Sequence, residues 1–233
     1  MFVPDRWHPM TTIRLFTFEL MKVKIGIRYY PRKQETILRS LKTIGNIRPI
    51  IYPDGVEYPF PNQYEIRNLG NNVGCFKHYY RTLEDLVKED ADIVGCFSDD
   101  IHYRKDWLNT ALQGFEKPNV GFVSCYVPRG VAERYSWKRH GFHRLNKGWA
   151  STWGGGYLFR KEIAIELLNH PFMIRHRDTY KKNQQIDHCL PEVMRRIKKK
   201  QLFHVPSLMT HIGHTSTIGH QHRPEDVGVG WAK

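Results

Sequence analysis

The sequence predicts an α/β protein whose strands form a doubly wound sheet with helices on both faces. Short, continuously apolar runs, typical of strands buried on both faces, alternate with segments whose apolar residues recur at helical spacing. The chain has 233 residues, 40% of them hydrophobic, which is enough for one domain with an ample core. We expect that single domain at residues 21–233, after a poorly patterned lead-in at residues 1–20.

The first part of the chain shows this alternation most clearly. A strand at residues 22–27 ends at Arg28 and Tyr29, and a helix with one apolar face follows at about 34–43. Residues 48–55 are predicted as a second strand closed by a Pro-Asp-Gly turn. The later predicted elements are strands at 64–67, 91–98 and 120–126 and helices at 75–88, 107–115, 161–169 and 184–200.

The strand at residues 91–98 is followed by two adjacent carboxylates, Asp99 and Asp100. In open α/β sheets, ligands bind at the carboxyl ends of strands, so this pair falls where chemistry is usually done. The alternative is an Asp-rich turn that caps the next helix. This segment alone leaves both interpretations open.

Three other segments carry residues suited to a ligand site. A polar loop at residues 68–74 contains Asn71, and three glycines at 154–156 stand between aromatic residues. Such segments can bring the backbone close to a ligand or simply make a turn. Asp187 lies near the start of the helix at 184–200, where an acidic residue often serves only as a cap or an end charge.

The chain is strongly basic, with 36 Lys and Arg against 23 Asp and Glu and a formal net charge of +13. This charge attracts polyanions such as nucleotides, nucleic acid or anionic membrane surfaces, and it does not choose among them. Residues 128–148 combine basic and aromatic side chains without a regular pattern. We expect a loop there, which either contacts an anionic partner or is a solvated surface loop.

The four cysteines are widely scattered, show no paired metal-ligand spacing and mostly lie in apolar surroundings, so they are expected to be reduced core residues. No apolar run reaches the ~20 residues that span a bilayer, and the N-terminus lacks the pattern of a signal peptide. These features predict a soluble, cytoplasmic protein, in a cell or a virus-infected host.

The order of features from residue 21 to about residue 218 resembles the GT-A fold of nucleotide-sugar glycosyltransferases. Ser98-Asp99-Asp100 is similar to the Asp-x-Asp motif of that family, with Ser98 where the first acidic residue often stands. Residues 206–213, Pro-Ser-Leu-Met-Thr-His-Ile-Gly, resemble a family segment whose histidine completes the metal site. The resemblance implies a Rossmann-like, mixed sheet with helices on both faces.

The resemblance also implies roles for individual residues. Asp100 and His211 would bind Mn²⁺ or Mg²⁺, with His214 as the alternative to His211, since oxygen and imidazole ligands together suit Mn²⁺. Asp187 would be the general base if the reaction inverts the anomeric carbon. The implied contacts to a nucleotide-sugar donor, expected to be UDP-linked, are Arg28, Tyr29, Asn71, Asp99, Gly154, Gly155 and Gly156.

We therefore expect a metal-dependent glycosyltransferase that transfers a sugar to a hydroxyl acceptor. The charge suggests a polyanionic acceptor, and a hydroxylated base in DNA is one candidate; a saccharide or a lipid-linked glycan is the alternative. A hypothesis of another class is a non-catalytic nucleic-acid-binding protein that uses the basic aromatic loop and the basic run at residues 195–200.

Overall fold

A computed structural model describes residues 21–30, 35–55, 60, 62–70, 73–144, 155–179, 186–212 and 228–231 of the chain. The described strands are β1 (Val23–Tyr29), β2 (Ile50–Pro53), β3 (Glu65–Ile66), β4 (Ile93–Ser98), β5 (Ile101–Tyr103), β6 (Val120–Ser124), β7 (Gly141–Arg144), β8 (Gly156–Arg160), β9 (Lys200–Val205) and β10 (Met209–His211). The described helices are α1 (Glu35–Thr43), α2 (Cys75–Leu86), α3 (Trp107–Gln113), α4 (Arg129–Arg134), α5 (Lys161–Asn169), α6 (Pro171–Asp178) and α7 (Ile186–Arg196), with a 3-10 turn at Gly114–Glu116.

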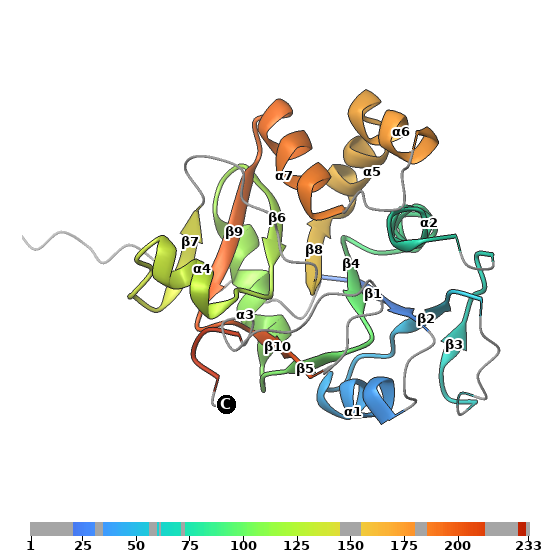
Figure 1. Ribbon diagram of the computed structural model, residues 1–233, viewed down its shortest axis with the longest axis horizontal. Coiled ribbons are helices and arrows are strands. Elements are labelled where there is room, and N and C mark those ends of the chain that lie inside the picture. The colour runs from blue at the N-terminus through green and yellow to red at the C-terminus, as the bar shows by residue number, and fades with distance from the viewer. Residues whose placement is uncertain are drawn as a thin grey trace, which may run out of the picture.

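These elements form a single α/β domain around an eight-stranded mixed sheet of order β3-β2-β1-β4-β8-β6-β9-β7 (Figure 1). β1 runs parallel to β2 and to β4, whereas β8 runs antiparallel to both β4 and β6. β10 and β5 form a separate two-stranded antiparallel sheet. The predicted doubly wound, mixed α/β fold is confirmed.

The central strands are buried because helices cover both faces of the sheet. One apolar core contains residues of α2, α5 and α7, and the other contains residues of α1 and α3. The six residues of β4 are all buried, which explains their continuously apolar sequence. Burial of this kind contributes about 25 cal/mol per Å² of apolar surface, so these two cores stabilise the packing of the helices on the sheet.

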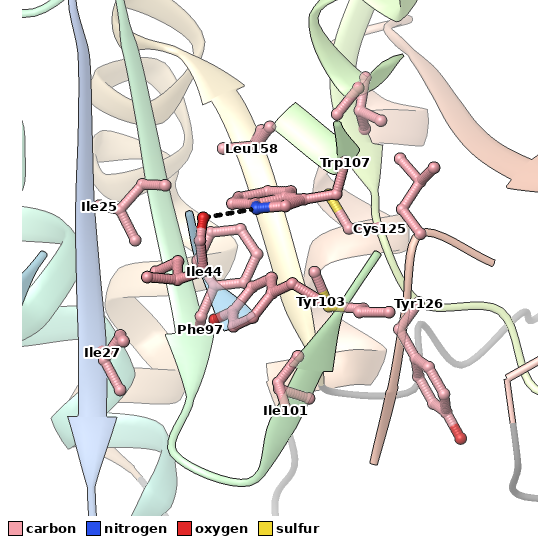
Figure 2. Packing of buried hydrophobic residues seen from close by; sticks show 14 of the residues in the cluster. Ile25, Ile27, Ile44, Phe97, Ile101, Tyr103, Trp107, Cys125, Tyr126 and Leu158 are labelled. Atoms are coloured by element: carbon pink, nitrogen blue, oxygen red, sulfur yellow. Dashed lines mark hydrogen bonds between the residues drawn. The ribbon is translucent and has the colours of Figure 1, made fainter. Parts of the chain in front are cut away.

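Aromatic side chains pack together in the core that contains residues of α1 and α3, directly beneath the carboxyl end of β4 (Figure 2). The ring centroids of Phe97 and Trp107 lie 5.3 Å apart, and those of Tyr103 and Trp107 lie 4.9 Å apart. The indole N–H of Trp107 donates a 3.0 Å hydrogen bond to the carbonyl of Ile44, so its one polar group is satisfied. This packing makes the connection from β4 to β5 rigid.

Two segments differ from the expectations. Residues 128–148 do not form a loop throughout, because α4 and the edge strand β7 lie within them; 145–148 are outside the described residues. β7 gains its structure by pairing with β9, a long-range contact that no local pattern shows. Residues 171–183, which look turn-like in sequence, begin with helix α6: Pro171 starts it, and His170 caps it by accepting from the Phe172 amide.

The four cysteines are free thiols, and Cys96, Cys125 and Cys189 are buried. Burial raises the pKa of the Cys96 thiol to about 12, which keeps it protonated and unreactive. Among the described helices, none combines the length and the apolar character that a membrane crossing requires. The lead-in at residues 1–20 lies outside the described residues.

Candidate functional site

The acidic pair forms the tight connection between β4 and β5. Asp99 is fully buried and Asp100 is 2% exposed. Neither caps a helix, because the next helix, α3, begins at Trp107 with Asp106 as its N-terminal cap residue. The buried carboxylates therefore form the turn at the carboxyl end of a central strand without capping a helix, and this position favours a ligand site.

His211 is brought to Asp100 by the small sheet of β5 and β10. β10 pairs with β5 so that His211 lies opposite Ile101, the residue after Asp100. The Nδ1 atom of His211 lies 3.3 Å from Oδ1 of Asp100, and the amide of Ile212 donates to the Asp100 carbonyl at 2.9 Å. The ring of Tyr126 packs edge-on against the imidazole, with 4.7 Å between centroids. Residues 111 positions apart in sequence thus form one pair, in which the Asp100 carboxylate is buried and the His211 side chain is 15% exposed.

This pair fits a divalent cation. Two ligand atoms at about 2.1 Å from one ion, in adjacent positions of an octahedron, lie about 3.0 Å apart, close to the observed 3.3 Å. A carboxylate oxygen and an imidazole nitrogen together suit Mn²⁺. Among the described residues, no group of three or more His, Cys, Asp or Glu side chains gathers to hold a metal, so phosphate or water oxygens would supply the other ligands. His214 lies outside the described residues.

Arg28 places a buried cation beside the acidic turn. Its side chain is 4% exposed, and its Nη2 atom donates to the hydroxyl of Ser98 at 3.1 Å. The Nη1 atom lies within hydrogen-bond distance of the Tyr30 hydroxyl, at 3.2 Å, and of the Cys75 sulfur, at 3.6 Å. The guanidinium also lies over the ring of Tyr79, 5.0 Å from its centroid.

These partners of Arg28 are neutral. Within the described residues, no carboxylate lies within ion-pair distance of the guanidinium, and its Nε–H is buried without a hydrogen-bond partner. A buried charge is costly unless an opposite charge compensates it. The arrangement therefore favours an anionic ligand near this end of β1. Ser98, which stands where the resemblance has an acidic residue, helps to hold the guanidinium of Arg28.

Asp99 is oriented by the adjacent strand. The backbone amide of Tyr30, just after β1, donates to Oδ2 of Asp99 at 3.1 Å. Asp99 and Asp100 therefore face different partners: the first carboxylate is tied to β1, and the second approaches His211 on β10. This division agrees with separate roles for the two acidic residues.

The described glycines allow β8 to approach the end of β4. The Ser98 amide donates to the Gly155 carbonyl at 3.1 Å, and a Cβ atom on Gly155 would lie 3.0 Å from Cβ of Tyr126. A Cβ atom on Gly156 would collide with the Phe97 ring. Close packing thus accounts for these two glycines, which also border the Tyr126–His211 contact, whereas Gly154 lies outside the described residues.

Asp187 lies in the first turn of α7 and is half-buried. Its Oδ1 atom accepts a 2.9 Å hydrogen bond from the hydroxyl of Tyr157, on β8. Tyr157 pairs with Cys96 of β4, so this contact connects the carboxylate to the strand that carries the acidic pair. The tyrosine fixes one oxygen of Asp187 and holds its side chain toward the sheet.

The remaining predicted contacts lie elsewhere. The ring of Tyr29 is 2% exposed and packs edge-on against Phe60, at 5.3 Å between centroids, so its side chain belongs to the apolar core. Asn71 lies outside the described residues. Sequence reasoning missed Asp54, a buried carboxylate after β2 whose Oδ1 accepts from the Val73 amide at 2.9 Å; its Pro-Asp-Gly context suggested only a turn.

No family model and no curated protein sequence matches the chain. Its structure is similar to 293 chains of solved structures. One of these is GalNAc-T7 in a crystal structure with UDP, GalNAc and Mn²⁺, which superposes with a TM-score of 0.58 at 9% sequence identity. The chain has a GT-A-like fold. The superposition covers 82% of this chain and 43% of the GalNAc-T7 chain, so this protein spans less than half of the length of that neighbour. The GT-A-like fold is thus present without detectable sequence similarity.

Proposed function

We propose that this protein is a metal-dependent glycosyltransferase that transfers a sugar from a nucleotide-sugar, most simply a UDP-linked one, to a hydroxyl acceptor. The observation that carries the proposal is the approach of the partly exposed His211 to the buried Asp100 at the carboxyl end of β4. A two-ligand site suits a cation that is shared with a diphosphate. The GT-A-like neighbour, whose structure contains both UDP and Mn²⁺, supports this interpretation.

Asp100 and His211 would hold the cation, Mn²⁺ or Mg²⁺. When bound, such an ion neutralises charge that develops on the diphosphate leaving group. Arg28 adds a second positive charge from the neighbouring strand, and its buried N–H groups are oriented before the donor arrives. The proposed donor contacts are Arg28, Tyr29, Asn71, Asp99, Gly154, Gly155 and Gly156, with Tyr29 limited to its backbone because its ring is in the core.

Asp187 is the proposed general base of an inverting reaction. As the sugar's anomeric carbon is attacked, the acceptor hydroxyl must lose its proton, and a carboxylate can accept it. The Tyr157 hydroxyl donates to Oδ1 of Asp187 and so orients the carboxylate. In this scheme Tyr157 is a positioning residue, because it acts on the base rather than on the substrate.

For the acceptor, we propose a polyanion, and specifically a hydroxylated base in DNA. The net charge of +13 supports an anionic acceptor. The alternative is a saccharide or a lipid-linked glycan, because a basic surface also serves to bind the phosphates of the donor. Incorporation of a labelled sugar into hydroxymethylated DNA, compared with glycan acceptors, distinguishes these classes.

The donor-side proposal is tested by incubating the protein with a panel of nucleotide-sugars and Mn²⁺ and measuring release of the nucleotide. We expect turnover of one donor class, with Asp100→Asn and His211→Ala each reducing it at least about a hundredfold, the scale of a lost electrostatic contribution to the transition state. Asp106→Asn is the matched control, since Asp106 occupies the N-cap position of α3, outside the site, and among the described residues its side chain makes no capping hydrogen bond there. Turnover that survives both site substitutions would rule out the proposed metal-dependent mechanism.

A further inference from the structure

The segment from α4 to β7 forms a basic surface, residues 129–144. It contains five Arg and Lys residues against one carboxylate, Glu133, and therefore carries a local charge of +4. Arg134, Lys138, Arg139 and Arg144 are exposed, and within the described part of the chain none of them has an ion-pair partner. By contrast, Arg195 and Arg196 on α7 are both paired with Glu192. The cations of residues 129–144 are thus available to an external anion.

A rigid stack of rings lies among these cations. Trp137 stacks on Tyr135, at 5.4 Å between centroids, and on His143 of β7, at 5.2 Å, with an interplanar angle of 24° in each case. The Trp137 amide is fixed by a 2.8 Å hydrogen bond to the carbonyl of Ala132. These contacts hold α4 and β7 side by side (Figure 1) and present half-exposed rings without loss of side-chain entropy on binding.

A cavity of about 360 Å³ opens beside the stack, within the size range of small-ligand sites. Arg129, Trp137 and Lys138 are among the residues that line it, together with Val229 of the C-terminal segment. Val229 hydrogen-bonds to Val127, which follows Tyr126, the residue packed on His211. The cavity is therefore linked to His211 through Val229, Val127 and Tyr126.

We propose that residues 129–144 dock a single-stranded segment of nucleic acid, with phosphates on the exposed cations and an unpaired base against the ring stack and cavity. Cations combined with ring faces suit a strand of this kind, since every base can stack and every phosphate is charged. A membrane surface is disfavoured, because the exposed large apolar residues in the described chain, Ile66 and Ile165, lie outside this surface. A neutral glycan would leave the cations unused.

This inference rests on the proposed function, in which a base is the acceptor. A base stacked inside a duplex cannot reach a site whose carboxylate, Asp100, is only 2% exposed, so a base acceptor must be unpaired or flipped out of the helix. A surface that holds unpaired nucleotides and is linked to His211 through Val127 and Tyr126 meets this requirement. Binding itself needs neither donor nor metal, which allows it to be measured separately from transfer.

The test is fluorescence anisotropy of a labelled oligothymidylate with the full chain, measured between about 50 and about 200 mM salt. Four neutralised phosphates on a single strand give a slope of log affinity against log salt of about −2.8, an affinity loss of about fiftyfold over this range. In the double variant Lys138→Glu/Arg139→Glu, two contacts are lost, so the slope should fall to about −1.4 and the loss to about sevenfold. Thermal unfolding confirms that the variant is folded.

The matched control is Lys42→Glu/Arg175→Glu, which changes the same number of charges at two exposed positions on α1 and α6, helices that lie away from α4 and β7 (Figure 1). It should keep the parental slope. If both double variants lose affinity equally, or if neither does, the docking surface is refuted. If the protein turns over a donor but the Lys138/Arg139 variant binds the oligothymidylate like the parent, only this inference is overturned. If that variant binds more weakly but no donor is turned over, only the proposed function is overturned.

Discussion

Replacing Arg28 with methionine separates a role in ligand binding from a role in folding. If Arg28 only supports the fold, its loss should destabilise the protein. If it is held for an anionic ligand, the substitution should leave stability nearly unchanged and weaken nucleotide binding. Methionine fills a similar volume with an unbranched, apolar side chain.

The magnitudes follow from the contacts of Arg28. It makes hydrogen bonds to Tyr30, Cys75 and Ser98, worth about 1 kcal/mol each, and its guanidinium lies over the rings of Tyr79, at 5.0 Å, and Tyr30, at 5.9 Å, contacts worth about 1 kcal/mol together. Against this stands the several kcal/mol cost of burying a charge that no carboxylate of the described chain compensates. The two contributions are of similar size, so we expect the free energy of unfolding to stay within about 1 kcal/mol or to rise.

Binding should respond very differently from stability. Loss of one charge-assisted interaction with a diphosphate costs about 2 kcal/mol, which weakens UDP binding about thirtyfold. Isothermal titration calorimetry with UDP and Mn²⁺, and urea unfolding, measure the two quantities. Arg160→Met is the matched control, because Arg160 also makes a carbonyl hydrogen bond and a ring contact, both with Phe115, outside the site. A large loss of stability with unchanged UDP affinity would refute the ligand role of Arg28.

Three further predictions concern groups around the site. Tyr157→Phe removes the 2.9 Å hydrogen bond to Asp187 and should lower the rate of transfer about tenfold while UDP affinity stays constant; equal loss of both would contradict a positioning role. Trp231→Ala should weaken Mn²⁺ binding, because Trp231 donates to Ser207 and packs under Arg104, and because its segment also holds Thr210, next to His211, through the Gly228 amide. Trp231→Phe should restore part of the Mn²⁺ affinity. Unchanged Mn²⁺ affinity in both variants would show that this segment does not support His211. Burial and the nearby Arg28 lower the pKa of His78 from 6.5 to about 3, so the unfolded state binds the proton more readily between these values. The stability that comes from keeping His78 neutral should therefore be fully present above about pH 6.5, and the free energy of unfolding should fall by up to about 1.4 kcal/mol per pH unit as the pH decreases. His78→Phe should flatten this slope in urea unfolding, and an unchanged slope would contradict the role of His78.

The central fold was predictable because burial dictates composition. β4 and β6 are buried along their whole length and are almost continuously apolar, and the last five residues of β1 are buried, so the apolar runs alone located these strands. α6 and β7 were not predictable in this way. α6 depends on a His170 cap and a proline start, and β7 depends on pairing with β9 at the sheet edge.

The candidate site was predictable only where a motif marked it. Asp100 was identified from its place after a buried strand and His211 from the family resemblance, but their 3.3 Å approach depends on the pairing of β5 with β10, which leaves no local trace. Nothing in the sequence signals that Arg28 lies among neutral partners or that Tyr157 holds Asp187, because both contacts join segments far apart in the chain. Asp54 was missed because it lies in a Pro-Asp-Gly sequence, which a simple turn explains equally well.

Mn²⁺ binding in the presence of UDP tests the central claim most directly. Electron paramagnetic resonance counts free Mn²⁺ and so gives the affinity without any turnover. We expect one UDP-dependent Mn²⁺ site, with Asp100→Asn and His211→Ala each weakening it by at least about tenfold, since even residues that only orient metal ligands contribute that much. Asp106→Asn should bind Mn²⁺ like the parent protein. Full Mn²⁺ affinity in both site variants would contradict the assignment of Asp100 and His211 as the metal ligands.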